Sequence, residues 1–137
     1  MTSIWYVCTD GACELGVIVE IDMQISAAKL KGNVVVINFW FTTCPPCVAE
    51  MPAFNKLVAE YKNKKVTFLG MTFNDKKTVN DFLKKKPFAV KIIPNAEKME
   101  DLFGILEHPV TLIIDKENKI RLAIAGSTIG DKAVDEA

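Results

Sequence analysis

Two cysteines separated by two prolines, Cys44-Pro45-Pro46-Cys47, are the residues best suited to chemistry in this sequence. They come shortly after a long apolar run, and they open a segment with the periodicity of an amphipathic helix. Two thiols with this spacing can form and release a disulfide, and the N-terminus of a helix stabilises negative charge on the first sulfur. We therefore predict a redox-active dithiol, in which Cys44 attacks a substrate disulfide and Cys47 resolves the mixed disulfide.

The surroundings of the Cys44 sulfur set the expected direction of electron flow. We expect Cys44 to be partly exposed at the helix N-cap and Cys47 to face inward. Neither Pro45 nor Pro46 has an N–H, so the Cys47 amide and thiol are the donors left near this sulfur on the helix. A weakly stabilised thiolate makes the dithiol less stable relative to the disulfide, and we therefore expect a reductant. A potential of about −120 mV, that of a strong oxidant, would contradict this hypothesis.

Glu50 is the candidate general base that takes the proton of Cys47. The two residues share one face of the predicted helix. Met51 and Phe54 adjoin that face, and removal of the carboxylate from water would raise its pKa toward neutrality, where a general base works best. The alternative is an exposed glutamate that interacts only with the helix dipole.

A structural disulfide and half of a zinc site are the alternatives for the Cys44/Cys47 pair. Zinc would need two more ligands, and Cys8 and Cys13 are the only other cysteines of the chain. Two prolines at a helix start, after a buried strand, fit a dithiol better. We therefore expect no metal ion and no cofactor other than the redox-active cysteines themselves.

Composition limits the classes of partner. The chain of 137 residues carries 17 Lys plus Arg and 17 Asp plus Glu, so its formal net charge is 0. A neutral chain lacks the broad positive surface that binds nucleic acid or anionic membranes. No apolar run approaches the roughly 18 residues of a membrane span. Residues 1–5 lack the charged-then-apolar order of a signal peptide. We expect a monomer that is either cytoplasmic or has its targeting segment absent from this chain.

Turn signals, caps and periodicity predict the elements of the chain. Asp10-Gly11 predicts the turn of an N-terminal hairpin over 1–22, in which Cys8 lies across from Cys13. For these two cysteines, a disulfide and a pair of free half-buried thiols are both open. Apolar periodicity and the positions of Pro and Gly predict the rest. Strands are expected at 34–40, 66–73, 88–93, 110–115 and 119–125, and helices at 44–61, 75–86, 95–103 and 128–137.

This order predicts one domain over residues 1–137 with an α/β fold. Alternating strands and helices indicate a mostly parallel sheet, and the short turn between the last two strands makes that pair antiparallel. We therefore expect a core over 34–125 with a mixed central sheet and helices on both faces. The N-terminal β-hairpin precedes this core, and a short final helix follows it over 128–137.

Two segments resemble a known family. Phe39–Cys47, followed by Glu-Met-Pro at 50–52, resembles the active-site region of thioredoxin-fold thiol-disulfide oxidoreductases of the TlpA/ResA-like branch. His-Pro-Val-Thr at 108–111, before an apolar run, resembles the cis-proline segment of that branch. The likeness extends from about residue 14 to the end of the chain. Three features depart from the pattern: Thr43 replaces the usual aromatic residue, both residues between the cysteines are proline, and the final helix is short, as in a truncated chain.

The resemblance implies a thioredoxin-like fold and an oxidoreductase that reduces protein disulfides through a mixed disulfide. It implies a task such as cytochrome c maturation or redox repair in the periplasm or cell envelope, with an unidentified dithiol as electron donor. It also implies a cis His108–Pro109 bond, which would hold the His108 backbone beside the cysteines to pair with an extended substrate. By this resemblance, Asn38 stands where classical thioredoxins place a buried Asp, and because Asn cannot accept a proton, the base would be Glu50.

Further residues around the cysteines are candidates for substrate binding. A protonated His108 imidazole would stabilise the Cys44 thiolate, and a plain loop histidine is the alternative. Trp40 is close to the site in sequence, and packing in the core or at the rim is its alternative role. The predicted substrate-binding residues are Trp40, Thr43, Pro45, Pro46, His108 and Pro109.

Two other functions compete with the oxidoreductase. A thiol peroxidase of the peroxiredoxin type has Thr three residues before its reactive cysteine, and this chain has Phe41 at that position. A thioredoxin-like binding module without turnover would not need the intact cysteine pair or Pro109. We therefore rank both below the oxidoreductase.

Overall fold

A computed structural model of the chain describes residues 6–9, 12–15, 32–117 and 119–126, the first two ranges by their backbone alone. The predicted final helix over 128–137 lies outside the described residues. So does most of the predicted N-terminal segment 1–22.

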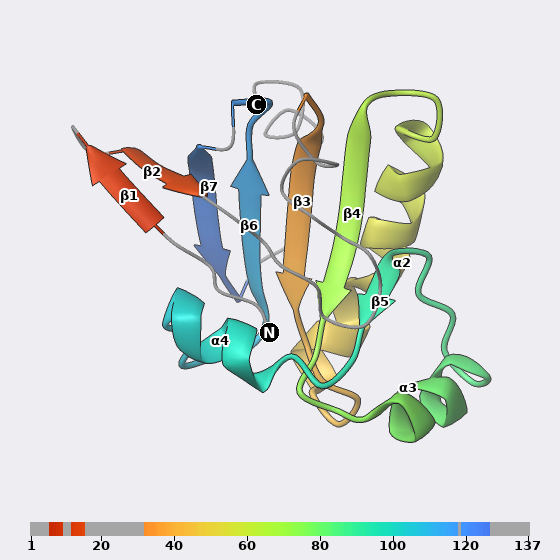
Figure 1. Cartoon of the computed structure of the whole chain (residues 1–137). Coiled ribbons are helices and arrows are strands. Elements are labelled where there is room, and N and C mark those ends of the chain that lie inside the picture. Colours follow the sequence, from red (N-terminus) through yellow and green to blue (C-terminus); the bar gives the residue numbers. More distant parts are fainter. Residues whose placement is uncertain (1–5, 10–11, 16–31, 118, 127–137) are drawn as a thin grey trace.

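A five-stranded mixed sheet forms the centre of the fold, with the strand order β5-β4-β3-β6-β7 (Figure 1). Strands β3 and β4, and likewise β4 and β5, pair in parallel, whereas β6 runs antiparallel to both β3 and β7. All residues of β3 are buried, which explains why its sequence is almost continuously apolar instead of alternating. The strands are β3 (Val34–Phe39), β4 (Val66–Met71), β5 (Lys91–Ile93), β6 (Val110–Ile114) and β7 (Ile120–Ala125).

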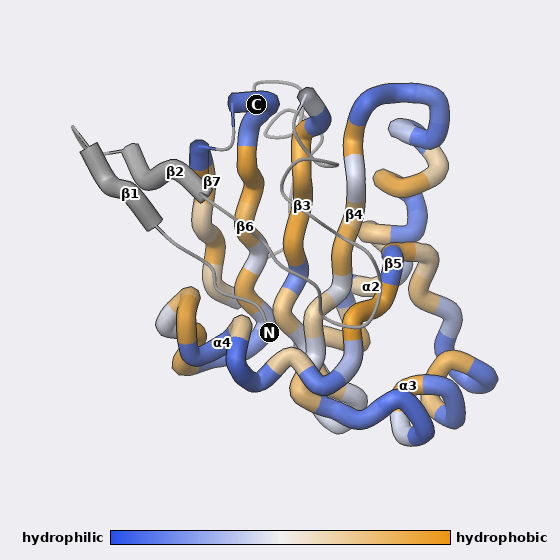
Figure 2. The backbone as a smooth tube through the Cα atoms, in the orientation of Figure 1, coloured by the Kyte–Doolittle hydropathy of each residue, from blue (hydrophilic) through white to orange (hydrophobic). Residues whose placement is uncertain are grey.

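Helices cover both faces of this sheet, as predicted. Successive side chains of a strand point to opposite faces. On one face, Val35 and Ile37 pack in the same cluster as Met99 of α4. On the other face, Val36 packs in the same cluster as Phe54 of α2, and α3 adds side chains to that side. Figure 2 shows that the central strands are hydrophobic, since β3 and β6 are orange over most of their length. The helices of the described residues are α2 (Pro45–Glu60), α3 (Lys76–Leu83) and α4 (Glu97–Phe103).

Helix α2 confirms the predicted segment 44–61. Cys44 is its N-cap and Tyr61 its C-cap, and Pro52 lies inside it. Two prolines occupy the first two helical positions, where their missing N–H groups would have no intrahelical partner in any case. The sequence thus starts this helix directly after Cys44, which places the cysteine at the positive end of the helix.

The shorter elements differ from the prediction at their ends. Helix α3 has Asp75 as its N-cap but ends at Leu83 instead of Lys86. Strand β5 covers only the second half of the predicted 88–93. Helix α4 begins at Glu97 instead of residue 95, because Asn95 has a left-handed backbone with φ of 53° that does not belong to a helix.

The N-terminal hairpin contains β1 (Tyr6–Thr9) and β2 (Ala12–Leu15), which pair antiparallel. The register places Cys8 opposite Cys13, as the Asp10-Gly11 turn predicts. Whether these cysteines form a disulfide or remain two free thiols stays open, because the side chains of the hairpin are outside the described set.

Candidate redox-active site

A disulfide joins Cys44 and Cys47 at the N-terminus of α2, and their Cα atoms are 5.2 Å apart. The Cys44 sulfur accepts a hydrogen bond from the backbone N–H of Cys47, with 3.3 Å between Sγ and N. This is the backbone donor that the sequence predicts, since Pro45 and Pro46 have none. The cysteines are therefore close enough to exchange between dithiol and disulfide, with one amide facing the first sulfur.

Both cysteines of the disulfide are buried. Cys44 is 2% exposed, so the prediction of a partly exposed sulfur is wrong for the disulfide form. The reason is that Cys44 and Cys47 belong to the hydrophobic cluster between α2 and the sheet, together with Met51 and Phe54. Access to the Cys44 sulfur therefore requires its neighbours to move.

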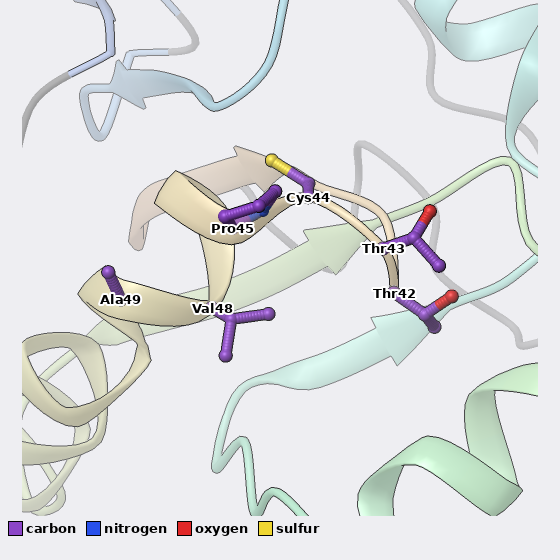
Figure 3. Close-up of a pocket in the computed structure, with 6 residues that line it drawn as sticks. All are labelled: Thr42, Thr43, Cys44, Pro45, Val48 and Ala49. Atoms are coloured by element: carbon purple, nitrogen blue, oxygen red, sulfur yellow. The ribbon is translucent and has the colours of Figure 1, made fainter.

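A surface hollow of about 440 Å³ lies beside the disulfide. Figure 3 shows that the Cys44 sulfur points away from the side chains of Thr42 and Thr43, which line this hollow. Thr43, Pro45 and Pro46 are exposed, so they are available to a substrate. The hollow is lined by Thr42, Thr43, Cys44, Pro45, Val48 and Ala49.

Glu50 lies one helical turn after Cys47 on the buried side of α2. Its carboxylate is withdrawn from water, since Glu50 is 6% exposed, and the exposed-glutamate alternative is wrong. Burial raises the pKa of Glu50 above its ordinary value of 4.5, and a hydrogen bond from Asn38 opposes that rise without cancelling it. A carboxylate with a raised pKa beside a buried cysteine suits a general base.

Asn38 links three elements of the site. Its Nδ2 group donates to Glu50 Oε1 of α2 at 3.0 Å and to Thr111 Oγ1 of β6 at 3.2 Å. The sequence identifies Asn38 only as a residue that cannot accept a proton. Its role as a donor, and that of Thr111 as an acceptor, follow from the register that sets Asn38 directly opposite Thr111.

The His108–Pro109 peptide bond is cis, as the resemblance implies. Pairing of Phe39 with Val110 puts this bond at the end of the sheet from which the chain leads to Cys44. The buried Pro109 is fixed on its other side, because its carbonyl accepts a hydrogen bond from the Gly126 N–H at 2.8 Å.

The imidazole of His108 faces a carboxylate and two aromatic rings. Its Nε2 atom lies 2.5 Å from Glu100 Oε1. Its ring centroid lies 5.1 Å from that of Phe41 and 5.9 Å from that of Phe73. Sequence reasoning missed Glu100 and Phe73, since both come from elements whose position relative to residue 108 depends on the tertiary fold.

Trp40 contributes to the core. It is 0% exposed and packs against Phe82 and Phe88, with ring centroids 5.5 Å away in each case. Its Nε1 atom is buried without a hydrogen-bond partner among the described residues. A Cβ on Gly70 would lie 2.7 Å from Val90 Cγ2 and 3.0 Å from that nitrogen, so the side chains around this position leave room for glycine only. This packing supports the core alternative for Trp40, not direct contact with a substrate.

The loop before Cys44 is held by Asn74. Asn74 Oδ1 accepts from the Thr42 N–H at 2.9 Å and from the Thr72 hydroxyl at 3.0 Å. The sequence allows Asn74 or Asp75 as a helix cap, and the structure assigns the cap to Asp75. Asn74 is thereby free to connect the end of β4 to the segment that carries the cysteines.

Across the described ranges, no three His, Cys, Asp or Glu side chains are grouped so as to hold a metal ion. That the protein works without a metal or other cofactor stays a prediction. Within the same ranges, no helix has both the length and the apolar character that crossing a bilayer requires.

Comparison with known sequences supports the resemblance to the ResA-like branch. The model of the AhpC/TSA family matches residues 12–123. Thiol-disulfide oxidoreductase ResA of Bacillus thuringiensis (strain Al Hakam) is 34% identical over 108 residues, which cover 75% of this chain and 61% of the relative. ResA of Halalkalibacterium halodurans is 35% identical over 99 residues, which cover 71% of this chain and 56% of the relative. The chain thus spans about three fifths of the length of these curated relatives.

Solved structures share the fold. A putative thioredoxin from Neisseria meningitidis matches with a TM-score of 0.71 and 27% identity, over 98% of this chain and 85% of the other. The thioredoxin-like superfamily protein SPOA0173 matches with a TM-score of 0.73 and 18% identity, over 99% of this chain and 93% of the other. StoA from Bacillus subtilis matches with a TM-score of 0.68 and 20% identity, over 82% of this chain and 86% of the other. The predicted thioredoxin-like fold is confirmed.

Proposed function

The chain belongs to the AhpC/TSA family, and on that premise we propose that it is a thiol-disulfide oxidoreductase that reduces protein disulfides. The observation that carries the proposal is the Cys44–Cys47 disulfide at the start of α2, at the end of the sheet where the cis His108–Pro109 bond lies. The ResA relatives bear the name thiol-disulfide oxidoreductase, and their similarity covers 75% of this chain. Cysteines that alternate between dithiol and disulfide carry the reaction without a bound cofactor.

The reaction runs from the reduced form of the protein. The Cys44 thiolate attacks one sulfur of a substrate disulfide, which forms a mixed disulfide and releases the first substrate thiolate. Cys47 then loses its proton to Glu50 and attacks the Cys44 sulfur, which releases the second substrate thiolate. Each released thiolate takes up a proton. Two electrons have passed to the substrate, and the Cys44–Cys47 disulfide of the structure is the product.

Glu50 fits the second step because it lies one helical turn after the resolving cysteine and its carboxylate is buried. Burial raises its pKa, which makes it a better proton acceptor than an exposed glutamate. The Asn38 amide orients Oε1 and has no proton to give up in this pH range. The proton taken from Cys47 therefore has one acceptor in this network.

Substrate binding is proposed at the exposed surface around the cysteines and at the cis-proline segment. Among the described residues, no backbone hydrogen bond ties His108 to another segment. Its backbone is thus available to pair with an extended polypeptide, a mode that other proteins use to add a strand. Because Cys44 is 2% exposed in the disulfide, we infer that the electron-donating dithiol gains access only when side chains around it move.

The direction of electron flow is the second part of the proposal. The Cys47 N–H is the single first-turn amide on the Cys44 sulfur, and the two prolines add none. A thiolate with so little support makes the dithiol less stable relative to the disulfide, which is the property of a reductant. By its resemblance to ResA, we propose that the protein acts in the cell envelope on substrates such as apocytochromes c, with a separate dithiol as donor.

Insulin reduction with dithiothreitol as electron donor tests the function. The wild-type protein should accelerate the reaction, and Cys44→Ser should abolish the acceleration. Reduced Cys47→Ser, mixed with insulin after dithiothreitol has been removed, should accumulate a covalent adduct that is visible on a non-reducing gel and disappears when reductant is added. The matched control is the double variant Cys8→Ser/Cys13→Ser, which should keep its turnover. Wild-type protein no faster than dithiothreitol alone would favour a binding module.

A thiol peroxidase is the second candidate, and the AhpC/TSA family match is the observation that favours it. Phe41 lies three residues before Cys44, at the position where peroxiredoxins have Thr, which argues against it. Consumption of hydrogen peroxide with dithiothreitol present decides between the two. We expect a rate close to that of Cys44→Ser, and a peroxide turnover faster than insulin reduction would reverse the ranking.

A further inference from the structure

The loop between α4 and the cis-proline is tied at both ends to one residue, Glu100. The Glu100 carbonyl accepts a hydrogen bond from the Ile105 N–H at 2.8 Å, where the loop begins. The Glu100 carboxylate meets His108 Nε2 at 2.5 Å, where the loop ends. Between these two contacts Leu106 is 96% exposed. Glu100 therefore closes the loop and leaves its tip in solvent.

Glu100 has few other ways to satisfy its carboxylate. The residue is 8% exposed, and the side chains of Glu100 and His108 are 10% and 14% exposed. A buried carboxylate needs a hydrogen-bond donor, and within the described ranges His108 is the side chain that provides one. Removal of either partner thus leaves the other without its main contact.

The contact reaches the reactive cysteine through packing. His108 stands edge-on to the ring of Phe41, with an interplanar angle of 87°. The Phe41 carbonyl accepts a hydrogen bond from the Cys44 N–H at 3.2 Å. Phe73 packs on both rings and closes the cluster. A continuous path of contacts therefore runs from the Glu100 carboxylate to the backbone of Cys44.

We propose that Glu100 is a positioning residue for disulfide exchange, which acts through His108 to hold the cis-proline loop and Phe41 in the arrangement that binds a substrate polypeptide beside Cys44. Neither Glu100 nor the loop tip contacts the sulfur atoms of the disulfide. The role therefore concerns a substrate large enough to touch the loop, and not a small dithiol. This inference rests on the proposed oxidoreductase function.

Kinetics on a large and a small substrate test the role. Glu100→Ala should raise KM for insulin about tenfold, as expected for loss of a charge-assisted hydrogen bond. Its kcat, and the rate at which dithiothreitol alone reduces the Cys44–Cys47 disulfide, should change less than about twofold. Glu100→Gln should restore KM, because the amide oxygen can still accept from Nε2–H. Glu97→Ala, at an exposed carboxylate of the same helix, is the matched control and should leave KM unchanged.

A double-mutant cycle tests whether Glu100 acts through His108. Glu100→Ala combined with His108→Ala should have the KM of His108→Ala alone, because the second change removes nothing more. Fully additive effects, or an unchanged KM in Glu100→Ala, would overturn the inference while leaving the oxidoreductase function in place. If Glu100→Ala does not fold, Glu100→Asp replaces it, since the shorter side chain should also raise KM. A wild-type protein without insulin reductase activity would overturn function and inference together.

Discussion

Two buried glutamates, Glu50 on α2 and Glu100 on α4, lie on opposite faces of the sheet and differ in the partner that each one meets. They are 6% and 8% exposed. Glu50 accepts from the neutral amide of Asn38, whereas Glu100 faces the basic imidazole of His108. Burial raises the pKa of Glu50 despite the hydrogen bond from Asn38, whereas the His108 ring fixes the position of the Glu100 carboxylate. The partner, and not burial alone, therefore decides what a buried carboxylate does.

The largest expected difference between the two sites is in catalysis. Glu50→Gln should lower kcat for insulin reduction about a hundredfold, since it removes the proton acceptor of Cys47. It should also remove the rise of rate with pH that ionisation of Glu50 causes. Glu100→Gln, which keeps an accepting oxygen, should stay within about twofold of wild type. Equal losses of kcat in both variants, or an unchanged pH profile in Glu50→Gln, would contradict the assignment of Glu50 as the base and Glu100 as a positioning residue.

A second carboxylate at position 38 should be the most destabilising change. Asn38→Asp places a negative charge about where the amide now donates to Glu50 at 3.0 Å. At pH 7 the free energy of unfolding should fall by about 3 kcal/mol, because one of two adjacent buried carboxylates must then be protonated. Urea denaturation at pH 7 and pH 5 should show most of the loss at the higher pH. Asn80→Asp, at an exposed site on α3, is the control. A loss of equal size at both pH values would argue against like-charge repulsion.

Thr111 provides a milder test of the Glu50 side of the comparison. Thr111→Val removes the acceptor of one hydrogen bond from Asn38 Nδ2 and keeps the shape of the side chain. The free energy of unfolding should fall by about 1 kcal/mol. Thr67→Val in β4 is the matched control for a hydroxyl-to-methyl change on a strand. If the free energy of unfolding falls equally in both variants, the Asn38–Thr111 hydrogen bond makes no contribution of its own to stability.

The smallest expected effect is the pH dependence of stability that Glu50 causes. Burial raises the pKa of Glu50 in the folded protein above 4.5, so the folded state holds this proton more tightly than the unfolded state. Stability therefore falls as pH rises from 4.5 through the folded-state pKa. Glu50→Gln should remove this dependence on pH. Relative to wild type, its free energy of unfolding should be higher by less than about 1 kcal/mol at pH 7 and unchanged at pH 4. A gain of equal size at both pH values would show that ionisation is not the cause.

Local patterns in the sequence predict the helices and strands. They also predict the part of the site formed by the cysteines, Glu50 and the cis-proline. The apolar face of α2 and the buried run of β3 fix both elements, and they put Glu50 on the buried side beside Cys47. The cis bond before Pro109 follows from the resemblance of its segment to a known family. These features depend on spacing within a segment or on a short motif, which a single sequence contains.

The remaining features of the site depend on contacts between segments that are distant in the sequence. Glu100 meets His108 only because α4 packs on the face of the sheet where the loop before β6 returns. Asn38 donates to Glu50 only because α2 packs on β3, and to Thr111 only because β6 pairs with β3. Burial of Cys44 likewise results from the cluster that α2 and the sheet form together. The periodicity of apolar residues does not predict these contacts, since each one depends on how the helices pack on the sheet.

The equilibrium between dithiol and disulfide at Cys44 and Cys47 tests the central proposal most directly. The protein, with Cys8 and Cys13 replaced by Ser, would be equilibrated in buffers of graded thiol-disulfide potential, alkylated and weighed by mass spectrometry. We predict one two-electron transition, at a potential well below the roughly −120 mV of strong oxidants. A couple that does not interconvert, or one that titrates near that value, would contradict a reductant built on these two sulfurs.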